Sequence, residues 1–188
     1  MGNYVNETDL NLHKEIEELK SLIRDVPDFP KPGIVFKDIT PLLHKPWAFQ
    51  KVIDYIGNRY VGLGIDIVAG IESRGFLLAA ALAYKIGAGL AIIRKPGKLP
   101  YKTISATYTL EYGEDKIEVH EDAIQEGMKV VLIDDVLATG GTMNAAIDLV
   151  ERLGGNIISV DFLLELTFLG GRERIQKRGY PVFSLIKF

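Results

Sequence analysis

Residues Lys129 to Thr142 read KVVLIDDVLATGGT and carry the strongest signal in the sequence. A short apolar run, Lys129 to Ile133, predicts a buried strand, and two adjacent acids, Asp134 and Asp135, follow it. A loop of small residues comes next and leads into a predicted helix, Met143 to Leu153. In open α/β sheets, ligands bind beyond the carboxyl ends of the strands. The stretch therefore predicts a ligand site where this strand passes into its helix.

The loop from Ala138 to Thr142 has the chemistry of a phosphate site. Its two glycines, Gly140 and Gly141, allow the backbone to approach a ligand closely, and the helix amino terminus behind them favours an anion. Thr139 and Thr142 add hydroxyl donors. The two acids repel a phosphate and suit hydroxyl groups or a divalent cation instead. A ribose 5-phosphate satisfies both halves of this site.

Two common nucleotide motifs are absent from the same stretch. No lysine follows the glycines, as a Walker-type loop requires, and no G-x-G-x-x-G opens the helix. An acid pair or a glycine pair alone is more often a simple turn, but the whole string in a strand–loop–helix context favours a binding function.

The remaining chain alternates between short apolar strands and helices, which predicts a mainly parallel twisted sheet flanked by helices, an α/β fold. The predicted strands are Ile65 to Ile71, Leu90 to Ile93, Ile157 to Leu164 and Val182 to Ile186, and the predicted helices are Trp47 to Tyr60, Gly75 to Ile86 and Gly171 to Lys177.

The two ends of this plan carry additions. A helix is predicted over Asp9 to Val26, and the prolines and glycine that follow predict an extended segment, so residues 1–45 are expected to cap the core. Thr103 to Tyr112 alternates like an antiparallel strand, turns at Gly113-Glu114-Asp115 and returns through Lys116 to His120. Residues 1–188 are expected to form one domain, with 94–120 as a mobile loop and hairpin lid.

Composition narrows the class of protein. The 188 residues are 47% hydrophobic and 25% charged with a net charge of -3, which is globular and argues against nucleic acid as a partner. There are no cysteines and only three scattered histidines, so a cysteine or histidine metal site is not expected. No signal peptide and no membrane-spanning run is visible, and a cytoplasmic location is expected.

Two further loops offer charged groups. Ser73 and Arg74 directly follow a predicted strand and precede a helix, which makes a second anion-ready turn. The Arg74 guanidinium has the planar donors that suit a pyrophosphate. Arg94, Lys95 and Lys98 form a basic loop, which on composition alone is a solvated surface run.

Several motifs together resemble a known family. KVVLIDDVLATGGT is similar to the phosphoribosyl pyrophosphate signature of type I phosphoribosyltransferases. FPKPGIVFKDITPLL (Phe29 to Leu43), ESRGF (Glu72 to Phe76), RKPGKLP (Arg94 to Pro100) and YTLEYG (Tyr108 to Gly113) resemble adenine phosphoribosyltransferases in sequence and order. The resemblance implies the type I phosphoribosyltransferase fold and a pentosyltransferase of purine salvage, which joins adenine to phosphoribosyl pyrophosphate and releases AMP and pyrophosphate.

The resemblance also implies roles for the sugar and pyrophosphate sites. Asp134 and Asp135 are expected to hold the ribose hydroxyls, and Ala138, Thr139, Gly140, Gly141 and Thr142 to wrap the 5-phosphate. The leaving pyrophosphate is expected to contact Ser73 and Arg74, with Arg94 and Lys98 reaching toward a partner subunit's site in a homodimer. Mg²⁺ is expected to be carried by the substrate, with no direct protein ligand.

The base site is implied by the resemblance alone. The Phe36 ring is expected to stack on adenine, the Val35 carbonyl to accept from its amino group, and the Lys37 amide to donate to N1. Glu111 is expected near N7 as a catalytic acid or base, and Tyr112 to lie with it on the lid. Hypoxanthine reverses the donor and the acceptor, so such a site rejects it.

Two alternatives stay open at this point. The same sugar site serves a phosphoribosyltransferase for hypoxanthine, guanine or xanthine. A phosphoribosyl pyrophosphate-sensing regulator shares the core, but it needs a DNA-binding module, and the net charge and the single helix expected before Phe29 disfavour one.

Overall fold

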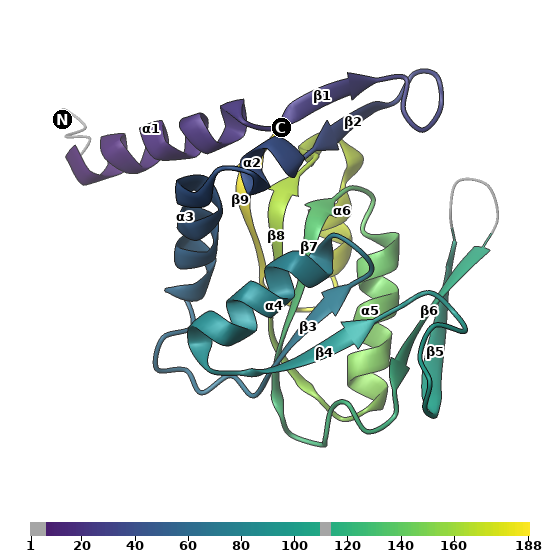
Figure 1. Cartoon of the computed structure of the whole chain (residues 1–188). Coiled ribbons are helices and arrows are strands. Elements are labelled where there is room, and N and C mark those ends of the chain that lie inside the picture. The colour runs from purple at the N-terminus through teal and green to yellow at the C-terminus, as the bar shows by residue number, and fades with distance from the viewer. Residues whose placement is uncertain (1–6, 110–113) are drawn as a thin grey trace. The chain divides into compact units, whose positions relative to one another are not determined.

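The computed structural model describes the backbone of residues 7–109 and 114–188 and the side chains of residues 11–108 and 114–188 (Figure 1). Within it, the chain divides into two compact units, residues 1–52 and 53–188. The single domain expected over 1–188 therefore stays a prediction.

The larger unit is built around a five-stranded parallel sheet in the order β4-β3-β7-β8-β9. The strands are β3 (Ile67–Ile71), β4 (Gly89–Ile93), β7 (Lys129–Leu137), β8 (Asn156–Glu165) and β9 (Val182–Lys187). Their central residues are mostly apolar, as strands covered on both faces require. The predicted mainly parallel α/β sheet is confirmed.

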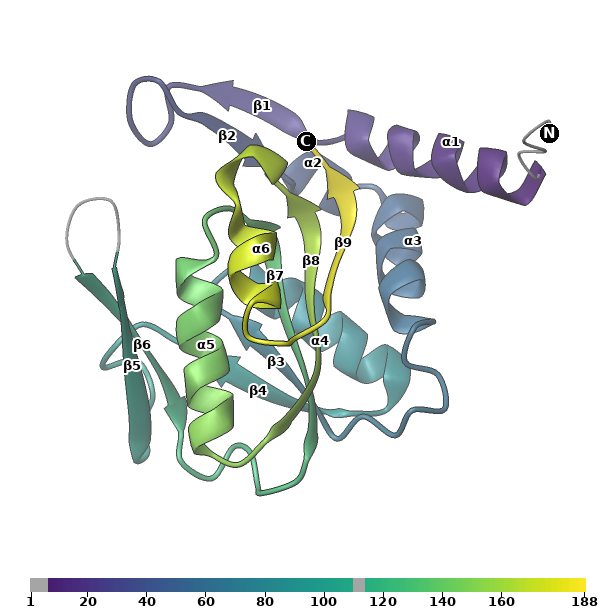
Figure 2. The same cartoon turned by 180° about the vertical axis from the view of Figure 1, so that it is seen from behind.

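Helices cover both faces of this sheet. α4 (Gly75–Ile86) lies on one face, and α5 (Gly141–Arg152) and α6 (Gly171–Gln176) lie on the other (Figures 1 and 2). α4 approaches β3 so closely that a methyl group on Gly70 would lie 2.5 Å from the Cβ of Ala79, so this contact depends on a residue without a side chain. The face under α5 holds the main cluster of buried apolar side chains.

Strand β7 is longer than the sequence predicted. The prediction ended the strand at Ile133, whereas Asp134 and Val136 still pair with Phe162 and Leu164 of β8. β8 is ten residues long, so it offers backbone partners beyond the apolar run of β7. The two acids therefore belong to the strand itself, and their side chains have the fixed directions of strand residues.

The predicted hairpin is present. β5 (Thr103–Thr109) pairs antiparallel with β6 (Glu114–His120), and a bridge from Arg94 to Glu118 joins β6 to the segment after β4. The expected turn at Gly113-Glu114-Asp115 was wrong in part, because Glu114 and Asp115 pair with Thr109 and Tyr108 within the ladder.

The smaller unit contains α1 (Glu7–Ser21), β1 (Arg24–Pro27), β2 (Val35–Asp38) and α2 (Thr40–Leu43), and α3 (Pro46–Gly57) begins in it. The helix predicted to Val26 ends at Ser21 instead. β1 and β2 form an antiparallel ribbon, which the sequence did not predict. Ion pairs Arg24–Asp38 and Lys37–Asp25, both 2.6 Å, join opposite residues of this ribbon and favour it over a longer helix.

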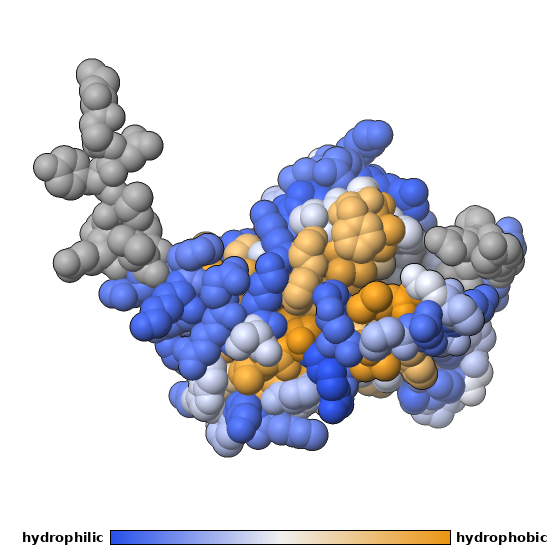
Figure 3. Space-filling model, turned by 90° about the horizontal axis from the view of Figure 1, so that it is seen from above, coloured by the Kyte–Doolittle hydropathy of each residue, from blue (hydrophilic) through white to orange (hydrophobic). Residues whose placement is uncertain are grey.

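The surface is mixed in character. On the face in Figure 3, hydrophilic residues surround smaller hydrophobic areas. In the larger unit, Leu77, Tyr84 and Leu90 of α4 and β4 are exposed, and burial of such side chains against another molecule is favourable. Of the helices that the structure describes, none combines the length and apolar character needed to cross a membrane.

Candidate active site

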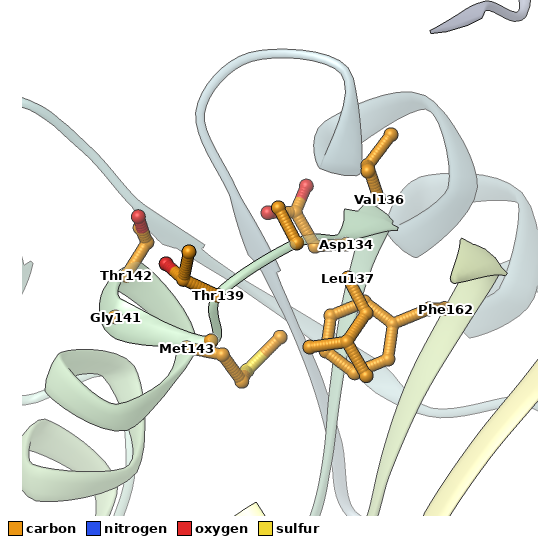
Figure 4. A pocket seen from close by; sticks show the side chains of 10 residues that line it. Asp134, Val136, Leu137, Thr139, Gly141, Thr142, Met143 and Phe162 are labelled. Carbon is orange, nitrogen blue, oxygen red and sulfur yellow. The ribbon is translucent and has the colours of Figure 1, made fainter. Parts of the chain in front are cut away.

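A pocket lies at the carboxyl end of β7, where the sequence predicted a ligand site. It has a cavity volume of about 80 Å³ and is lined by Asp134, Val136, Leu137, Met143, Phe162 and the loop Ala138 to Thr142 (Figure 4). The Asp134 carboxylate lies on one side, and the hydroxyls of Thr139 and Thr142 lie on the other. Carboxylate acceptors and hydroxyl donors thus border one hollow, as a sugar phosphate requires.

The loop from Ala138 to Thr142 turns β7 into α5. Gly140 has a φ of 79°, a left-handed conformation that disfavours a side chain, and its carbonyl accepts from both the backbone and the side-chain amide of Asn144 at 2.9 Å. No described side chain caps the amino terminus of α5. The first amide groups of an α-helix have no partner within the helix, so they are available to a phosphate.

The acid pair has unusual electrostatics. Asp134 is half-buried and Asp135 is only 4% exposed. Burial raises the pKa of Asp134 well above its usual value, and the charge of Asp135 raises it further. Burial also raises the pKa of Asp135, while the Arg74 guanidinium opposes this rise. Two carboxylates held this close favour a ligand that brings hydrogen-bond donors or a positive charge.

Arg74 joins two of the predicted loops. Its Nε lies 2.7 Å from Asp135 Oδ2, so the turn after β3 and the acid pair on β7 are in direct contact. The pair is held by charge, since Asp135 Oδ2 accepts no hydrogen bond from the part of the chain that the structure describes. Gly75, the next residue, packs on Asp134, where a methyl group would lie 2.7 Å from the carboxylate oxygen.

The basic loop after β4 is organised around Glu72, a residue that the sequence pattern did not single out. Arg94 Nε lies 3.3 Å from Glu72, the Lys95 amide donates to it at 2.9 Å, and Lys98 forms an ion pair with it. Burial raises the pKa of Glu72, but these hydrogen bonds lower it more, to about 2. The structure thus places Arg94 and Lys98 against Glu72, the residue that precedes Ser73.

A sequence signal for Glu72 existed. It directly precedes Ser73 and Arg74, at the end of an apolar strand, and an acid there has cations of the neighbouring strand's loop within reach. The parallel pairing of β3 with β4 brings the ends of these two strands together, at Ile71 and Ile93. That pairing could not be read from local sequence, which is why the basic loop was first interpreted as a solvated run.

The predicted base-binding residues lie on β2, in the smaller unit. Val35 is 48% exposed, and the Phe36 ring packs edge-on against Phe29 with ring centres 5.2 Å apart. Lys37 forms its ion pair with Asp25 across the ribbon. These three residues belong to a different unit from the pocket. Glu111 and Tyr112 lie outside the described residues.

The match to known proteins covers most of the chain. The family model for the phosphoribosyl transferase domain matches residues 39–186. A protein of Geobacter metallireducens named adenine phosphoribosyltransferase is 58% identical over 92% of this chain and 100% of its own length. The chain belongs to the adenine phosphoribosyltransferase family. The resemblance identified from the sequence is confirmed.

Solved structures of adenine phosphoribosyltransferases share the fold. The enzyme of Thermoanaerobacter pseudethanolicus is 53% identical, with a TM-score of 0.88 over 92% of this chain and 99% of that chain. The Saccharomyces cerevisiae enzyme is 40% identical, with a TM-score of 0.86 over 93% and 99%, and was solved with adenine and D-2,5-dideoxy-2,5-imino-altritol 1,6-bisphosphate. The expected type I phosphoribosyltransferase fold is therefore confirmed.

Proposed function

We propose that this protein transfers a phosphoribosyl group from phosphoribosyl pyrophosphate to adenine, with AMP and pyrophosphate as products. The observation that carries the proposal is the pocket at the end of β7, where the Asp134 carboxylate and a phosphate-ready loop line one hollow and Asp135 follows directly in the strand. Family membership supports the choice of reaction. The bisphosphate and the adenine with which the yeast enzyme was solved support the choice of both substrates.

In this proposal, the sugar half of the substrate occupies the pocket. Asp134 and Asp135 accept hydrogen bonds from the ribose hydroxyls. The oxygens of the 5-phosphate accept hydrogen bonds from the backbone amides and side-chain hydroxyls of Ala138 to Thr142. An ionised carboxylate is a stronger hydrogen-bond acceptor than a carboxylic acid, so binding is expected to weaken as the pH falls through the raised pKa values of the pair.

The pyrophosphate is assigned to the turn at Ser73 and Arg74. Arg74 already contacts Asp135. We therefore expect the pyrophosphate, bound by Arg74, to lie next to the ribose hydroxyls, bound by Asp135. Arg94 and Lys98 complete the anion site, either in the same protomer or in a partner. A homodimer is proposed on the exposed Leu77, Tyr84 and Leu90, whose apolar surface a second copy can cover.

Mg²⁺ is proposed to enter with the pyrophosphate. Among described side chains, no group of three His, Cys, Asp or Glu residues is arranged to hold a metal ion. Magnesium prefers six oxygen ligands, and a site with so few carboxylates leaves most of them to substrate and water. When bound, the ion neutralises charge on the departing pyrophosphate.

Base recognition is assigned to Val35, Phe36 and Lys37, with further roles for Glu111 and Tyr112. Phe36 stacks on the purine, and the backbone of Val35 and Lys37 reads its Watson–Crick edge. Glu111 donates or accepts a proton at N7 as the charge of the purine changes, and Tyr112 lies on the lid that excludes water. N9 of adenine then attacks the anomeric carbon as pyrophosphate leaves from the opposite face, and positioning of the two substrates supplies much of the acceleration.

The test is direct. The pure protein is incubated with phosphoribosyl pyrophosphate, Mg²⁺ and one nucleobase at a time, and nucleotides are quantified by chromatography. AMP formed with adenine alone is the expected result. Product from hypoxanthine, guanine or xanthine instead would contradict the base assignment and keep the sugar site. Binding of phosphoribosyl pyrophosphate without any product would favour the regulator.

A further inference from the structure

The phosphate loop rests on the start of α6. A methyl group added to Gly171 would overlap the carbonyl oxygen of Ala138 and lie 3.1 Å from the amide nitrogen of Gly140. In the opposite direction, a methyl group on Gly140 would lie 3.1 Å from the Gly171 carbonyl oxygen. The two backbones are therefore in contact without intervening side chains. Any shift of Gly171 moves the loop that is proposed to bind the 5-phosphate.

Arg172 fixes the position of Gly171. Its guanidinium meets Glu165 of β8 with Nε at 2.9 and 3.1 Å from the two carboxylate oxygens and a terminal nitrogen at 2.5 Å. It also donates to the Val182 carbonyl at 2.8 Å and to Ser184 Oγ at 3.1 Å, both on β9. Glu165 is only 3% exposed. Through these hydrogen bonds, the planar guanidinium of Arg172 links the first turn of α6 to two strands of the sheet, β8 and β9.

A second tie holds the far end of the same helix. Arg178 follows α6 and donates to the Asn144 carbonyl at 3.0 Å, and Asn144 in turn holds the Gly140 carbonyl at 2.9 Å. The loop is therefore supported through Gly171 on one side and through Asn144 on the other. A glycine-rich loop is otherwise free to take many conformations, and each phosphate contact then costs ordering entropy.

We propose that Arg172 is a positioning residue for the phosphate loop: through Gly171, its bond to Glu165 holds the backbone of Ala138 to Thr142 in the geometry that receives a sugar phosphate. The proposal rests on the proposed function for the identity of the ligand. Arg172 lies outside the residues that line the pocket and acts only through the backbone next to it. The predicted consequence is selective, since the sugar phosphate depends on this loop and the base does not.

The test compares three variants with the wild-type protein. Arg172→Leu removes the fork, Arg172→Lys keeps the charge without the fork, and Gly171→Ala displaces the loop directly. Affinity for ribose 5-phosphate is measured by calorimetry, and KM for each substrate by the AMP assay. We expect Arg172→Leu and Gly171→Ala to weaken ribose 5-phosphate binding and to raise KM for phosphoribosyl pyrophosphate by about tenfold or more, with KM for adenine little changed. Arg172→Lys is expected to fall between them and the wild type.

Gly89→Ala is the matched control. Its methyl group would lie 2.8 Å from the flexible end of Ile67 and 3.3 Å from the Asp66 carbonyl oxygen, at the amino end of β4 and outside the residues that line the pocket. Thermal unfolding of every variant shows which are folded at the assay temperature. If Arg172→Leu is not folded, the comparison of Arg172→Lys with the wild type tests the role of Arg172. Unchanged ribose 5-phosphate affinity in Arg172→Lys and Gly171→Ala would overturn the proposal, as would an equal rise of KM for both substrates.

The two proposals can fail separately. If the wild-type protein binds ribose 5-phosphate but makes no AMP, the proposed function is wrong, and the calorimetric comparison still tests Arg172. If the wild-type protein does not bind ribose 5-phosphate at all, the role of Arg172 as a support for a sugar-phosphate loop is overturned as well.

Discussion

Replacement of Gly75 by alanine is expected to damage the sugar site although no residue proposed to bind a ligand is itself replaced. Gly75 begins α4, and its φ lies outside the left-handed range, so the backbone accepts alanine there. The new methyl group would stand 2.7 Å from Asp134 Oδ1 and 3.2 Å from the Ile133 carbonyl oxygen. The second neighbour is backbone and cannot turn away, so the strain falls on the Asp134 carboxylate.

The size of the effect follows from the required shift. Ordinary contact begins near 3.4 Å, so the carboxylate must move by the difference from 2.7 Å, about 0.7 Å. A displacement of about 1 Å in a positioned group can cost roughly a hundredfold in rate. We therefore expect kcat/KM for phosphoribosyl pyrophosphate to fall by about 10- to 100-fold, which is about 1.4 to 2.7 kcal/mol of transition-state stabilisation. Overpacking should also lower the free energy of unfolding by about 1 to 3 kcal/mol.

Steady-state AMP formation, with each substrate varied in turn, measures this prediction. Gly89→Ala again serves as the control, because its new methyl group is crowded to a similar degree, by the end of the Ile67 side chain and the Asp66 carbonyl oxygen, but meets no proposed site residue. The kinetics are read below the unfolding transition, so that loss of stability and loss of activity are separated. A Gly75→Ala protein that keeps kcat/KM within twofold of wild type would refute the argument that Asp134 must stay where the structure places it.

Three other substitutions have distinct expected outcomes. Asp134→Asn should raise Tm by about 2 to 4 °C at neutral pH, because the raised pKa makes the ionised form a cost to the fold. This gain should shrink as the pH falls below that pKa, where wild-type Asp134 is protonated, and a pH series of unfolding curves checks the sign. Tyr60→Phe removes a 2.5 Å hydrogen bond to the fully buried Asp161 and should cost about 1.5 to 3 kcal/mol in chemical denaturation, with both KM values unchanged. Glu111→Leu should lower kcat by about a hundredfold with a smaller change in KM for adenine, and an unchanged kcat in steady-state assays would remove Glu111 from the mechanism.

The sequence was most informative where local pattern and chain order agree. The run from Lys129 to Thr142 predicted a buried strand, a ligand site and a helix, and the pocket lies there. The parallel sheet followed from the alternation of strands and helices, because crossover connections of that length join parallel strands. The chemistry proposed for the loop was also local, since glycine and threonine are proposed to act there through their own backbone and hydroxyl groups.

The misses share a different cause, which is pairing between distant segments. The helix predicted to Val26 gave way to the β1–β2 ribbon, whose ion pairs join residues more than ten positions apart. The strand predicted to end at Ile133 continued to Leu137, because β8 supplies its partners. Glu72 and Arg172 gained their importance in the same way. Each looks like an ordinary surface charge in the sequence and becomes half-buried only when neighbouring strands assemble.

The Glu72 carboxylate has a further consequence for turnover. Without a ligand, Glu72 pairs with the cations Arg94 and Lys98 and accepts from the Lys95 amide, so part of the positive charge of the basic loop is already neutralised. If that loop receives pyrophosphate as proposed, arrival of the substrate is an exchange of one anion for another rather than capture by bare charges. The net free energy gained on pyrophosphate binding is then smaller. Glu72 can form its ion pairs with Arg94 and Lys98 again as the product departs. An enzyme that must release a highly charged product in every cycle benefits from such an internal competitor, because tight capture would slow release.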